Sequence, residues 1–240
     1  LHLSLRRQRQ MCIRDRLRSI NPSPYLFFFD YGDFKIFGSS PEAQIIIKDG
    51  KSEIHPIAGT FKRTGNDEED QKTAKELAED PKENSEHIML VDLARNDLSR
   101  SGYNVKIEKN REVQFYSHVI HLVSKVTSIL KDNIKPFQVV EDTFPAGTLS
   151  GAPKHRALEL IEKYEKVNRN FYGGAIGYID FNGNFNHAII IRSFFSKNNI
   201  LNYQAGAGIV IDSIPEKELE EVKNKLGALD KALEEAEKIK

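Results

Sequence analysis

The chain has 240 residues, of which 39% are hydrophobic and 9% aromatic, an ordinary composition for a globular protein with one sizeable core or two small ones. Basic and acidic residues both number 35, so the net charge is zero and no overall field attracts nucleic acid or an anionic membrane. A single cysteine, Cys12, excludes an internal disulfide framework, and no apolar run is long enough to span a bilayer. We therefore expect a cytoplasmic protein that binds any anion at a local site.

The first sixteen residues, Leu1 to Arg16, differ in character from the rest. The stretch LRRQRQMCIRDR is strongly basic, lacks helical or strand periodicity, and resembles the translated adapter sequence found in shotgun assemblies. A disordered tail and a basic arm for nucleic acid are the alternative interpretations. We exclude this stretch from the fold and expect the folded domain to cover residues 17–240, as the C-terminal part of a longer protein.

Strand-like runs begin at Tyr25. YLFFFD, FKIFG, AQIIIK and SEIHPI are separated by turn residues and predict two hairpins. Residues 66–100 are rich in charge, have helical spacing and are interrupted at Asp80-Pro81, which predicts helices over 68–79 and 82–95. We expect a short strand pair at 103–116 and then a helix over 117–130.

Turn residues dominate 143–153, and a helix is expected over 154–165. Three long runs follow, Tyr172–Phe181, Asn184–Phe195 and Ile200–Ile211, and the turns between them predict a three-stranded meander. The chain closes with a helix over 215–239, for which Ser213 is the candidate N-cap. This order of elements predicts an α+β fold with mainly antiparallel β-sheets, sandwiched with helices.

Two pairs of glutamates stand out by their spacing. Glu83 and Glu86 lie three residues apart in one predicted helix, and Glu218 and Glu221 lie three apart in the last one. Their oxygens could hold a hard cation such as Mg²⁺. The alternative is that each pair belongs to a solvated helix face, because both segments are rich in charge.

A second set of residues is suited to binding an anion. Arg192 sits late in the apolar run HAIIIRS, where a buried charge needs a partner such as a bidentate carboxylate. Gly206 and Gly208 in QAGAGIV would let a ligand carboxylate approach the backbone N–H groups. Equally, the glycines could mark a bulge, and Arg192 could pair with an internal acid.

The turn GTLSGAPK, residues 147–154, has glycines, hydroxyls and a lysine but lacks the phosphate-loop spacing, so we reject a nucleotide site. His121 in HVIHLVS lies near the apolar stripe of its predicted helix. It is a candidate general acid or, alternatively, a packing residue.

Short blocks along the chain resemble, in the same order, the signature blocks of the chorismate-utilising enzymes, closest to the large subunit of anthranilate synthase. The blocks are PIAGT (56–60), KENSEHIMLVDLARND (82–97), HVIHLVS (118–124), GTLSGAPK (147–154), YGGAIGY (172–178), IIIRS (189–193), AGAGIV (205–210) and DSIPEKELEEVKNK (212–225). The resemblance runs from about Ser39 to the C-terminus. It implies the chorismate-binding fold, in a version truncated at its N-terminus.

The resemblance also implies roles for the candidate residues. Glu86 and Glu221 would bind Mg²⁺, with Glu83 and Glu218 supporting it largely through water, and the metal would hold the ring carboxylate of chorismate. His121 and Thr148 would lie near the C4 hydroxyl, with His121 as its proton donor. The remaining substrate contacts would come from Ala58, Gly59, Thr60, Tyr172, Arg192, Gly206, Gly208 and Lys225.

The implied reaction is amination of chorismate at C2 with loss of the C4 hydroxyl, followed by elimination of pyruvate to give anthranilate for tryptophan biosynthesis. Ammonia would come from a glutamine amidotransferase subunit. The rival aminodeoxychorismate synthases typically carry a lysine in PIKGT, where this chain has Ala58. Isochorismate and salicylate synthases usually lack a GTLSGAPK block, and a truncated, non-catalytic chorismate-binding remnant is a further alternative.

Overall fold

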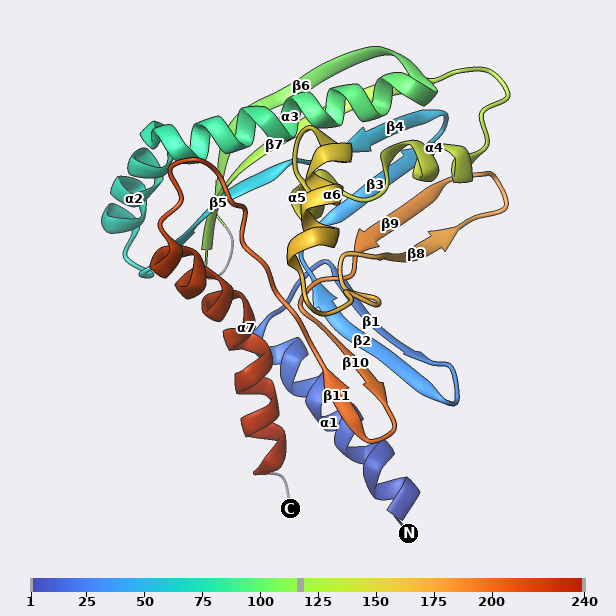
Figure 1. The fold of residues 1–240 in the computed structure, drawn as a ribbon, viewed down its shortest axis with the longest axis vertical. Helices are drawn as coiled ribbons and strands as arrows, with labels where there is room; N and C mark the ends of the chain where they lie inside the picture. The colour runs from blue at the N-terminus through green and yellow to red at the C-terminus, as the bar shows by residue number, and fades with distance from the viewer. Residues whose placement is uncertain (1, 116–118, 239–240) are drawn as a thin grey trace. The chain divides into compact units, whose positions relative to one another are not determined.

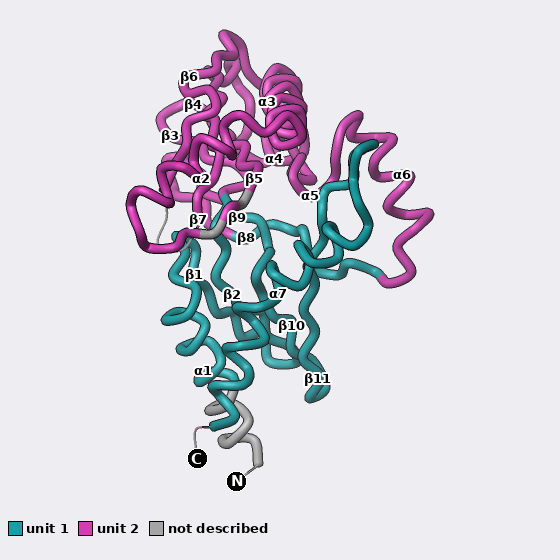
Figure 2. Tube along the Cα trace, turned by 90° about the vertical axis from the view of Figure 1, so that its left-hand side faces the viewer, with its two compact units in different colours: residues 1–42, 168–176, 188–240 teal, residues 43–167, 177–187 magenta. Residues whose placement is uncertain are grey.

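The computed structural model describes residues 2–115 and 119–238, with the backbone alone for residues 2–9, Thr60 and Lys62. It combines helices with antiparallel sheets (Figure 1), which confirms the expected α+β class. The chain divides into two compact units (Figure 2): residues 1–42, 168–176 and 188–240 form unit 1, and residues 43–167 and 177–187 form unit 2. Within the described ranges, no helix combines the length and the apolarity that a membrane crossing requires.

Unit 1 is built on a four-stranded sheet in the order β1-β2-β10-β11. Its elements are β1 (Tyr25–Asp30), β2 (Phe34–Ser40), β10 (Ser193–Lys197), β11 (Ile200–Asn202), α1 (His2–Ile20) and α7 (Pro215–Glu237). The two helices lie side by side (Figure 1) and share one buried apolar cluster with the sheet. The cluster consists of Leu17, Phe37, Phe194, Leu229 and Ala232.

Helix α1 includes residues 2–16, which we excluded from the fold because their sequence lacks periodicity, and residues 17–20, which we assigned to the folded domain. Ile13, Leu17 and Ile20 are four and three residues apart, so they share one face of a helix. Leu17 is fully buried, and the other two pack against the same cluster. Tertiary contacts of this apolar face therefore stabilise a helix that the basic composition did not predict.

Unit 2 centres on a larger sheet in the order β5-β7-β4-β3-β9-β8, with β6 also paired to β7. Its strands are β3 (Ala43–Lys48), β4 (Lys51–Ile54), β5 (Ile57–Lys62), β6 (Gly102–Phe115), β7 (Val119–Leu130), β8 (Ala175–Ile179) and β9 (Phe185–Ile189). Its helices are α2 (Asp67–Glu79), α3 (Pro81–Ser101), α4 (Pro136–Thr143), α5 (Gly147–Ser150) and α6 (Lys154–Tyr164). The boundary between the units falls inside β8 and β9.

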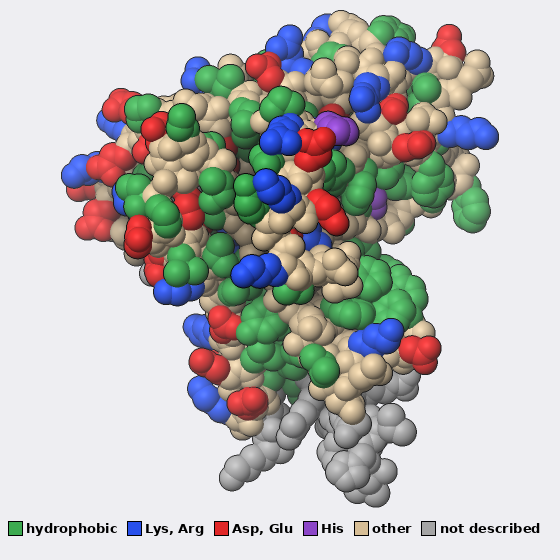
Figure 3. Space-filling view, viewed as in Figure 1, with side chains coloured by type: hydrophobic (Ala, Val, Ile, Leu, Met, Phe, Trp, Pro, Cys, Tyr) green, Lys and Arg blue, Asp and Glu red, His purple; other side chains and the backbone are tan. Residues whose placement is uncertain are grey.

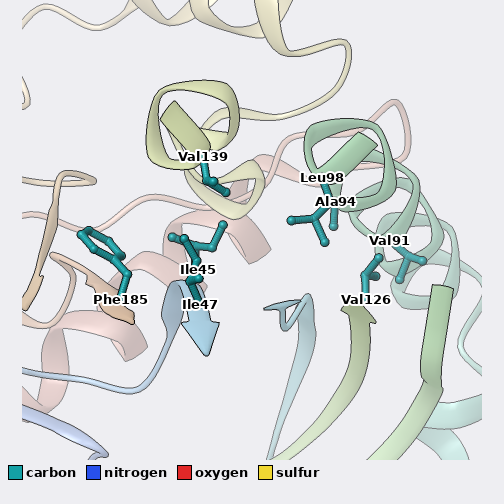
Figure 4. Close-up of a cluster of buried hydrophobic side chains, with 8 residues drawn as sticks. All are labelled: Ile45, Ile47, Val91, Ala94, Leu98, Val126, Val139 and Phe185. Atoms are coloured by element: carbon teal, nitrogen blue, oxygen red, sulfur yellow. The ribbon is translucent and has the colours of Figure 1, made fainter. Parts of the chain in front are cut away.

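Helix α3 lies along one face of this sheet (Figure 1) and supplies much of the core of unit 2. The buried cluster in Figure 4 joins it to strands β3, β7 and β9 and to helix α4. Its members are Ile45, Ile47, Val91, Ala94, Leu98, Val126, Val139 and Phe185. A second cluster packs Ala74 and Leu77 of α2 against Ile120 and Leu122 of β7. Strand β7 therefore contributes to both cores.

Most of the expected elements are confirmed. The runs after Tyr25 form two antiparallel hairpins, β1–β2 and β3–β4. Helices α2, α6 and α7 match their predicted ranges closely, and α3 begins as expected but continues to Ser101.

The helix predicted over 117–130 is wrong, because residues 119–130 form strand β7. β-Branched residues dominate this run, and such side chains favour a pleated strand. Burial on both sides of the strand removes the polar alternation that would have distinguished it from a helix. The strand pair predicted at 103–116 is likewise wrong: it is the single strand β6, which pairs with β7 along most of its length.

The predicted three-stranded meander is also wrong. The middle run breaks before Arg192, so that β9 belongs to the large sheet and β10 to the sheet of unit 1. The third run ends its strand at Asn202, and the glycine segment after it has no regular structure. The turns at Asn182-Gly183 and Asn198-Asn199 join strand neighbours as expected, but they serve two different sheets.

Candidate active site

The residues singled out from the sequence fall into both units. Unit 2 holds Ala58, Gly59, Thr60, Glu83, Glu86, His121 and Thr148. Unit 1 holds Tyr172, Arg192, Gly206, Gly208, Glu218, Glu221 and Lys225. Basic and acidic side chains are interspersed over the face shown in Figure 3, in keeping with the zero net charge. Anion binding therefore depends on individual side chains in each unit.

At Gly59 strand β5 packs closely against side chains of helices α2 and α3. Its φ of +68° lies in the left-handed region that glycine adopts without strain. A Cβ at this position would come within 2.6 Å of Leu77 Cδ1 and 3.1 Å of Glu83 Oε2, so a side chain would collide. The strand backbone therefore passes beside the Glu83 carboxylate. Ala58 next to it is buried, whereas the side chain of Thr60 lies outside the described part of the structure.

His121 lies on strand β7 and not on a helix, and its ring is tied to the same glycine. The ring Nδ1 is 2.7 Å from the Gly59 carbonyl oxygen. Because a carbonyl only accepts hydrogen bonds, Nδ1 carries a hydrogen, and Nε2 is the nitrogen that can exchange a proton with a substrate. In the neutral ring Nε2 then carries a lone pair, so donation of a proton through Nε2 requires the doubly protonated imidazolium, whose Nδ1–H the Gly59 carbonyl also accepts.

Glu83 and Glu86 occupy the first turns of α3, on one side of the helix and half-buried. The helix start is well defined, because Asp80 accepts a hydrogen bond from the Glu83 backbone N–H over 2.9 Å and Pro81 fills the first helical position. This cap fixes the helix end on which both carboxylates sit.

Thr148 lies in the single turn of α5, which rests on the same helix. A Cβ added to Gly147 would meet Leu93 Cδ2 at 2.7 Å and Leu90 Cδ2 at 3.6 Å. The bare backbone before Thr148 therefore packs directly on α3, beyond the two glutamates.

Arg192 separates β9 from β10 and has a φ of +51°, a left-handed conformation that is uncommon for residues other than glycine. Such strain at one position is a frequent mark of a functional site. Burial lowers the pKa of the guanidinium, and the neighbouring Tyr172, Glu42 and Glu221 act in the opposite direction. Arg192 is therefore a half-buried cation among acceptor groups of its own unit, suited to hold a carboxylate.

Tyr172 and the glycine segment lie near Arg192 within unit 1. The turn after Tyr172 is bonded to the strand end before Arg192, since the Gly173 N–H donates to the Ile190 carbonyl over 3.0 Å. A Cβ on Gly206 would lie 3.4 Å from the Tyr172 hydroxyl. The structure thus brings Tyr172 and Gly206 together, and Gly208 follows in the same exposed segment.

Helix α7 begins with the second glutamate pair. Glu218 is only 5% exposed, whereas Glu221 pairs with Lys225 one turn later, as their spacing predicts. Lys225 Nζ also donates to the Gly206 carbonyl over 2.8 Å. The expected N-cap is wrong: the cap residue is Ile214, without a side-chain bond, while the Ser213 hydroxyl accepts from the Val210 N–H.

The residues fit a hard cation in their chemistry. The carboxylate oxygens of each pair project from one side of a helix. Glu218 is buried, and a carboxylate away from water favours a cation partner. Among the residues that the structure describes, no three or more His, Cys, Asp or Glu side chains gather into a group that could hold a metal ion. The metal site therefore stays a prediction from the residues.

The sequence did not identify two charged neighbours. Glu42, in the turn after β2, contributes to the field at Arg192 although it lies far away in the chain. Lys154, in the rejected phosphate-loop motif, binds Asp97 at the other end of α3 from the glutamate pair. No local pattern signals either partner, because the fold alone brings them together.

Comparison with known proteins identifies the class. Residues 3–231 match the family described as chorismate binding enzyme, so this chain belongs to the chorismate-binding enzyme family. The expected resemblance to the large subunit of anthranilate synthase is confirmed.

Anthranilate synthase component 1 of Aquifex aeolicus is 48% identical over 223 residues, which are 92% of this chain and 45% of that protein. The Bacillus pumilus protein of the same name is 51% identical over 225 residues, 93% of this chain and 44% of that protein. The chain thus spans about half the length of the curated relatives that it matches.

Solved structures extend the comparison. Anthranilate synthase component I from Streptococcus pneumoniae superposes with a TM-score of 0.82 at 42% identity, covering 90% of this chain and 48% of that one. The menaquinone-specific isochorismate synthase MenF from Escherichia coli gives 0.84 at 25% identity, covering 92% and 51%. The fold is shared by enzymes with different names, so it does not by itself select the reaction.

Proposed function

We propose that this chain carries the chorismate-binding part of an anthranilate synthase large subunit. The reaction joins chorismate and ammonia and yields anthranilate, pyruvate and water. The observation that carries the proposal is the set of ordered motif residues, which agrees with 46–51% identity to proteins named anthranilate synthase component 1. The product would enter tryptophan biosynthesis.

In unit 2, His121 is the proposed proton donor to the C4 hydroxyl as it leaves, with ammonia adding at C2. The hydrogen bond from Nδ1 to the Gly59 carbonyl supports this role, because it orients the ring, and the proton would pass through Nε2 of the imidazolium form. Thr148 would lie near the same hydroxyl, and the PIAGT residues Ala58, Gly59 and Thr60 would line the ring.

In unit 1, Arg192 is the proposed partner of the enolpyruvyl carboxylate. Its planar guanidinium can bind a carboxylate through two parallel hydrogen bonds. The hydroxyl of Tyr172, the backbone of Gly206 and Gly208, and the ammonium of Lys225 would complete this contact. Their proximity within the unit supports the assignment.

Glu86 and Glu221 are the proposed Mg²⁺ ligands, with Glu83 and Glu218 as supporting carboxylates. The bound cation would neutralise the ring carboxylate of chorismate and the negative charge that develops in the ring system. The protein would contribute carboxylate oxygens from the first turns of α3 and α7. The start of α3 is capped by the side chain of Asp80.

Ammonia would be delivered by a glutamine amidotransferase partner. Cys12, the single cysteine, lies in α1 outside the motif blocks, so this chain is not expected to hydrolyse glutamine itself. We place the protein in the cytoplasm, where a chain with one cysteine and no disulfide framework is typical.

Pyruvate release tests the proposal and separates it from a non-catalytic remnant. The purified chain, supplied with chorismate, Mg²⁺ and ammonium at alkaline pH, should release pyruvate, and chelation of the metal should stop the release. Binding of chorismate without any release of pyruvate would favour the remnant and contradict the proposal.

A further inference from the structure

The lysine of the GTLSGAPK block has no role in the proposed chemistry, yet it is anchored in buried surroundings. Lys154 Nζ donates to Asp97 Oδ2 over 2.7 Å and to the Thr143 carbonyl over 2.8 Å. Asp97 is 5% exposed and Thr143 1%. Burial raises the pKa of the Asp97 carboxyl, and the hydrogen bond from Lys154 opposes that effect. The ammonium thus neutralises an internal carboxylate of unit 2 and does not face a substrate anion.

Asp97 ends a stripe of side chains along one side of α3. The stripe consists of Glu83, Glu86, Leu90, Leu93 and Asp97. Spacings of three and four residues alternate along it, which places all of its members on one face of the helix. The first two are proposed metal ligands, and the last one binds the lysine of the turn.

The GTLSGAPK turn packs against the middle of this stripe. Leu90 and Leu93 pack against Gly147, where an added Cβ would lie 2.7 Å from Leu93 Cδ2, so a side chain there would have to displace Leu93. The turn is closed by the Gly151 N–H, which donates to the Gly147 carbonyl over 2.9 Å. Gly147 before Thr148 and Lys154 after it therefore fasten the turn to α3 at two points.

We infer that Lys154 is a positioning residue, whose bonds to Asp97 and Thr143 hold the Thr148 turn at a fixed place along α3 relative to Glu83 and Glu86. The inference rests on the proposed function, in which Thr148 acts near the C4 hydroxyl. Loss of these bonds leaves the proposed metal and carboxylate ligands in place but frees the turn. Turnover should therefore fall while chorismate binding is retained.

Three variants test this role. Lys154→Met removes the bonds and leaves Asp97 buried without its cation, whereas Lys154→Met combined with Asp97→Leu removes both charges. Lys163→Met is the matched control, since it makes the same change at an exposed position of the same helix. The measurements are kcat and KM for chorismate, the melting temperature, and hydrogen exchange of the Leu149, Ser150 and Gly151 amides.

Lys154→Met should lower kcat at least about tenfold with KM nearly unchanged, and lower the melting temperature by about 10 °C, because a lone buried charge is costly. The double variant should regain most of the melting temperature but not the turnover, since an apolar pair lacks the directional bonds. Both should exchange the three turn amides faster than the control by about tenfold or more.

If the double variant recovers kcat together with the melting temperature, the Lys154–Asp97 pair serves stability alone, and the inference is overturned. Unchanged exchange of the turn amides in Lys154→Met would overturn it as well. The exchange measurement needs no substrate. If the unmodified chain forms no product, the proposed function fails, and exchange alone decides the positioning role.

Discussion

Helices α3 and α7 carry glutamate pairs with the same spacing, but their surroundings differ. α3 starts at a side-chain cap and buries residues along its whole length, from His87 to Ser101. α7 starts without a side-chain cap, buries Glu218 near its start, and has its other buried residues only from Leu229 onward. Its first turns are held through Lys225, which links Glu221 to the Gly206 carbonyl.

This difference shows that spacing defines which side chains can act together but not how firmly they are held. The pair on α3 is fixed by the helix itself, through its cap and its core contacts. The pair on α7 is fixed by polar contacts with the segment that also carries Gly206. Loss of the cap or core contacts of α3 should therefore lower stability, whereas loss of the polar contacts at the start of α7 should weaken ligand binding.

The largest effect is expected from the charged ligands. Glu221→Gln and Glu86→Gln should each reduce Mg²⁺-dependent turnover about a hundredfold, because each removes a negative ligand while keeping the side-chain shape. Glu220→Gln is the control, since Glu220 is an exposed neighbour in the same turn of α7. Steady-state rates over a Mg²⁺ titration measure the effect. Full activity of either ligand variant would remove that helix from the proposed metal site.

A smaller effect is expected at Arg192. Arg192→Lys keeps the positive charge but loses the planar fork, so chorismate affinity should fall about tenfold. KM and direct binding by calorimetry measure the change, and the melting temperature serves as the control for folding. Unchanged affinity in a normally folded variant would make Arg192 the internal partner of Glu42 and Glu221 only.

The caps give a contrast in stability. Asp80→Ala removes the bond to the Glu83 N–H and should lower the free energy of unfolding by about 1 kcal/mol. Ile214→Asp supplies α7 with the cap it lacks, at a residue that is 46% exposed, and should raise stability by about 0.5 kcal/mol. Denaturant titrations measure both. An unchanged free energy of unfolding in Asp80→Ala, or a lower one in Ile214→Asp, would contradict this account of the two helix starts.

The smallest effect concerns pH. The Tyr203 hydroxyl donates to Asp230 Oδ1 over 2.6 Å, and this bond raises its pKa to about 12 from 10.0. A raised folded-state pKa stabilises the protein below pH 10, and this contribution is lost as the pH rises from 10 to 12. Tyr203→Phe should cost about 1 kcal/mol at pH 8 and lose less stability than the unmodified chain between pH 10 and 12. Parallel stability curves above pH 10 would contradict the assignment.

Local signals predicted much of the fold. The break at Asp80-Pro81 separated α2 from α3, and the Asp49-Gly50 turn defined the β3–β4 hairpin, because these residues act on their immediate neighbours. Strand β7 was not predictable in this way, since its identity depends on partners on both sides. The break at Arg192 was missed because residues other than glycine seldom adopt a positive φ, so the local sequence does not predict one at an arginine.

In the candidate site, too, local contacts could be predicted from the sequence and long-range contacts could not. The contact between Glu221 and Lys225 follows from helical spacing and could be predicted. The bonds of His121 to Gly59 and of Lys154 to Asp97 join residues far apart in the sequence, so only the folded chain reveals them.

Identification of the product tests the central claim most directly. Chromatography of the mixture formed from chorismate, Mg²⁺ and ammonium should show anthranilate and an equal amount of pyruvate, because Ala58 leaves C2 open to ammonia. Ala58→Lys should slow this reaction, since the buried ammonium would have to lose its charge or occupy the space of the incoming ammonia. Formation of 4-amino-4-deoxychorismate or isochorismate by the unmodified chain would contradict the anthranilate assignment.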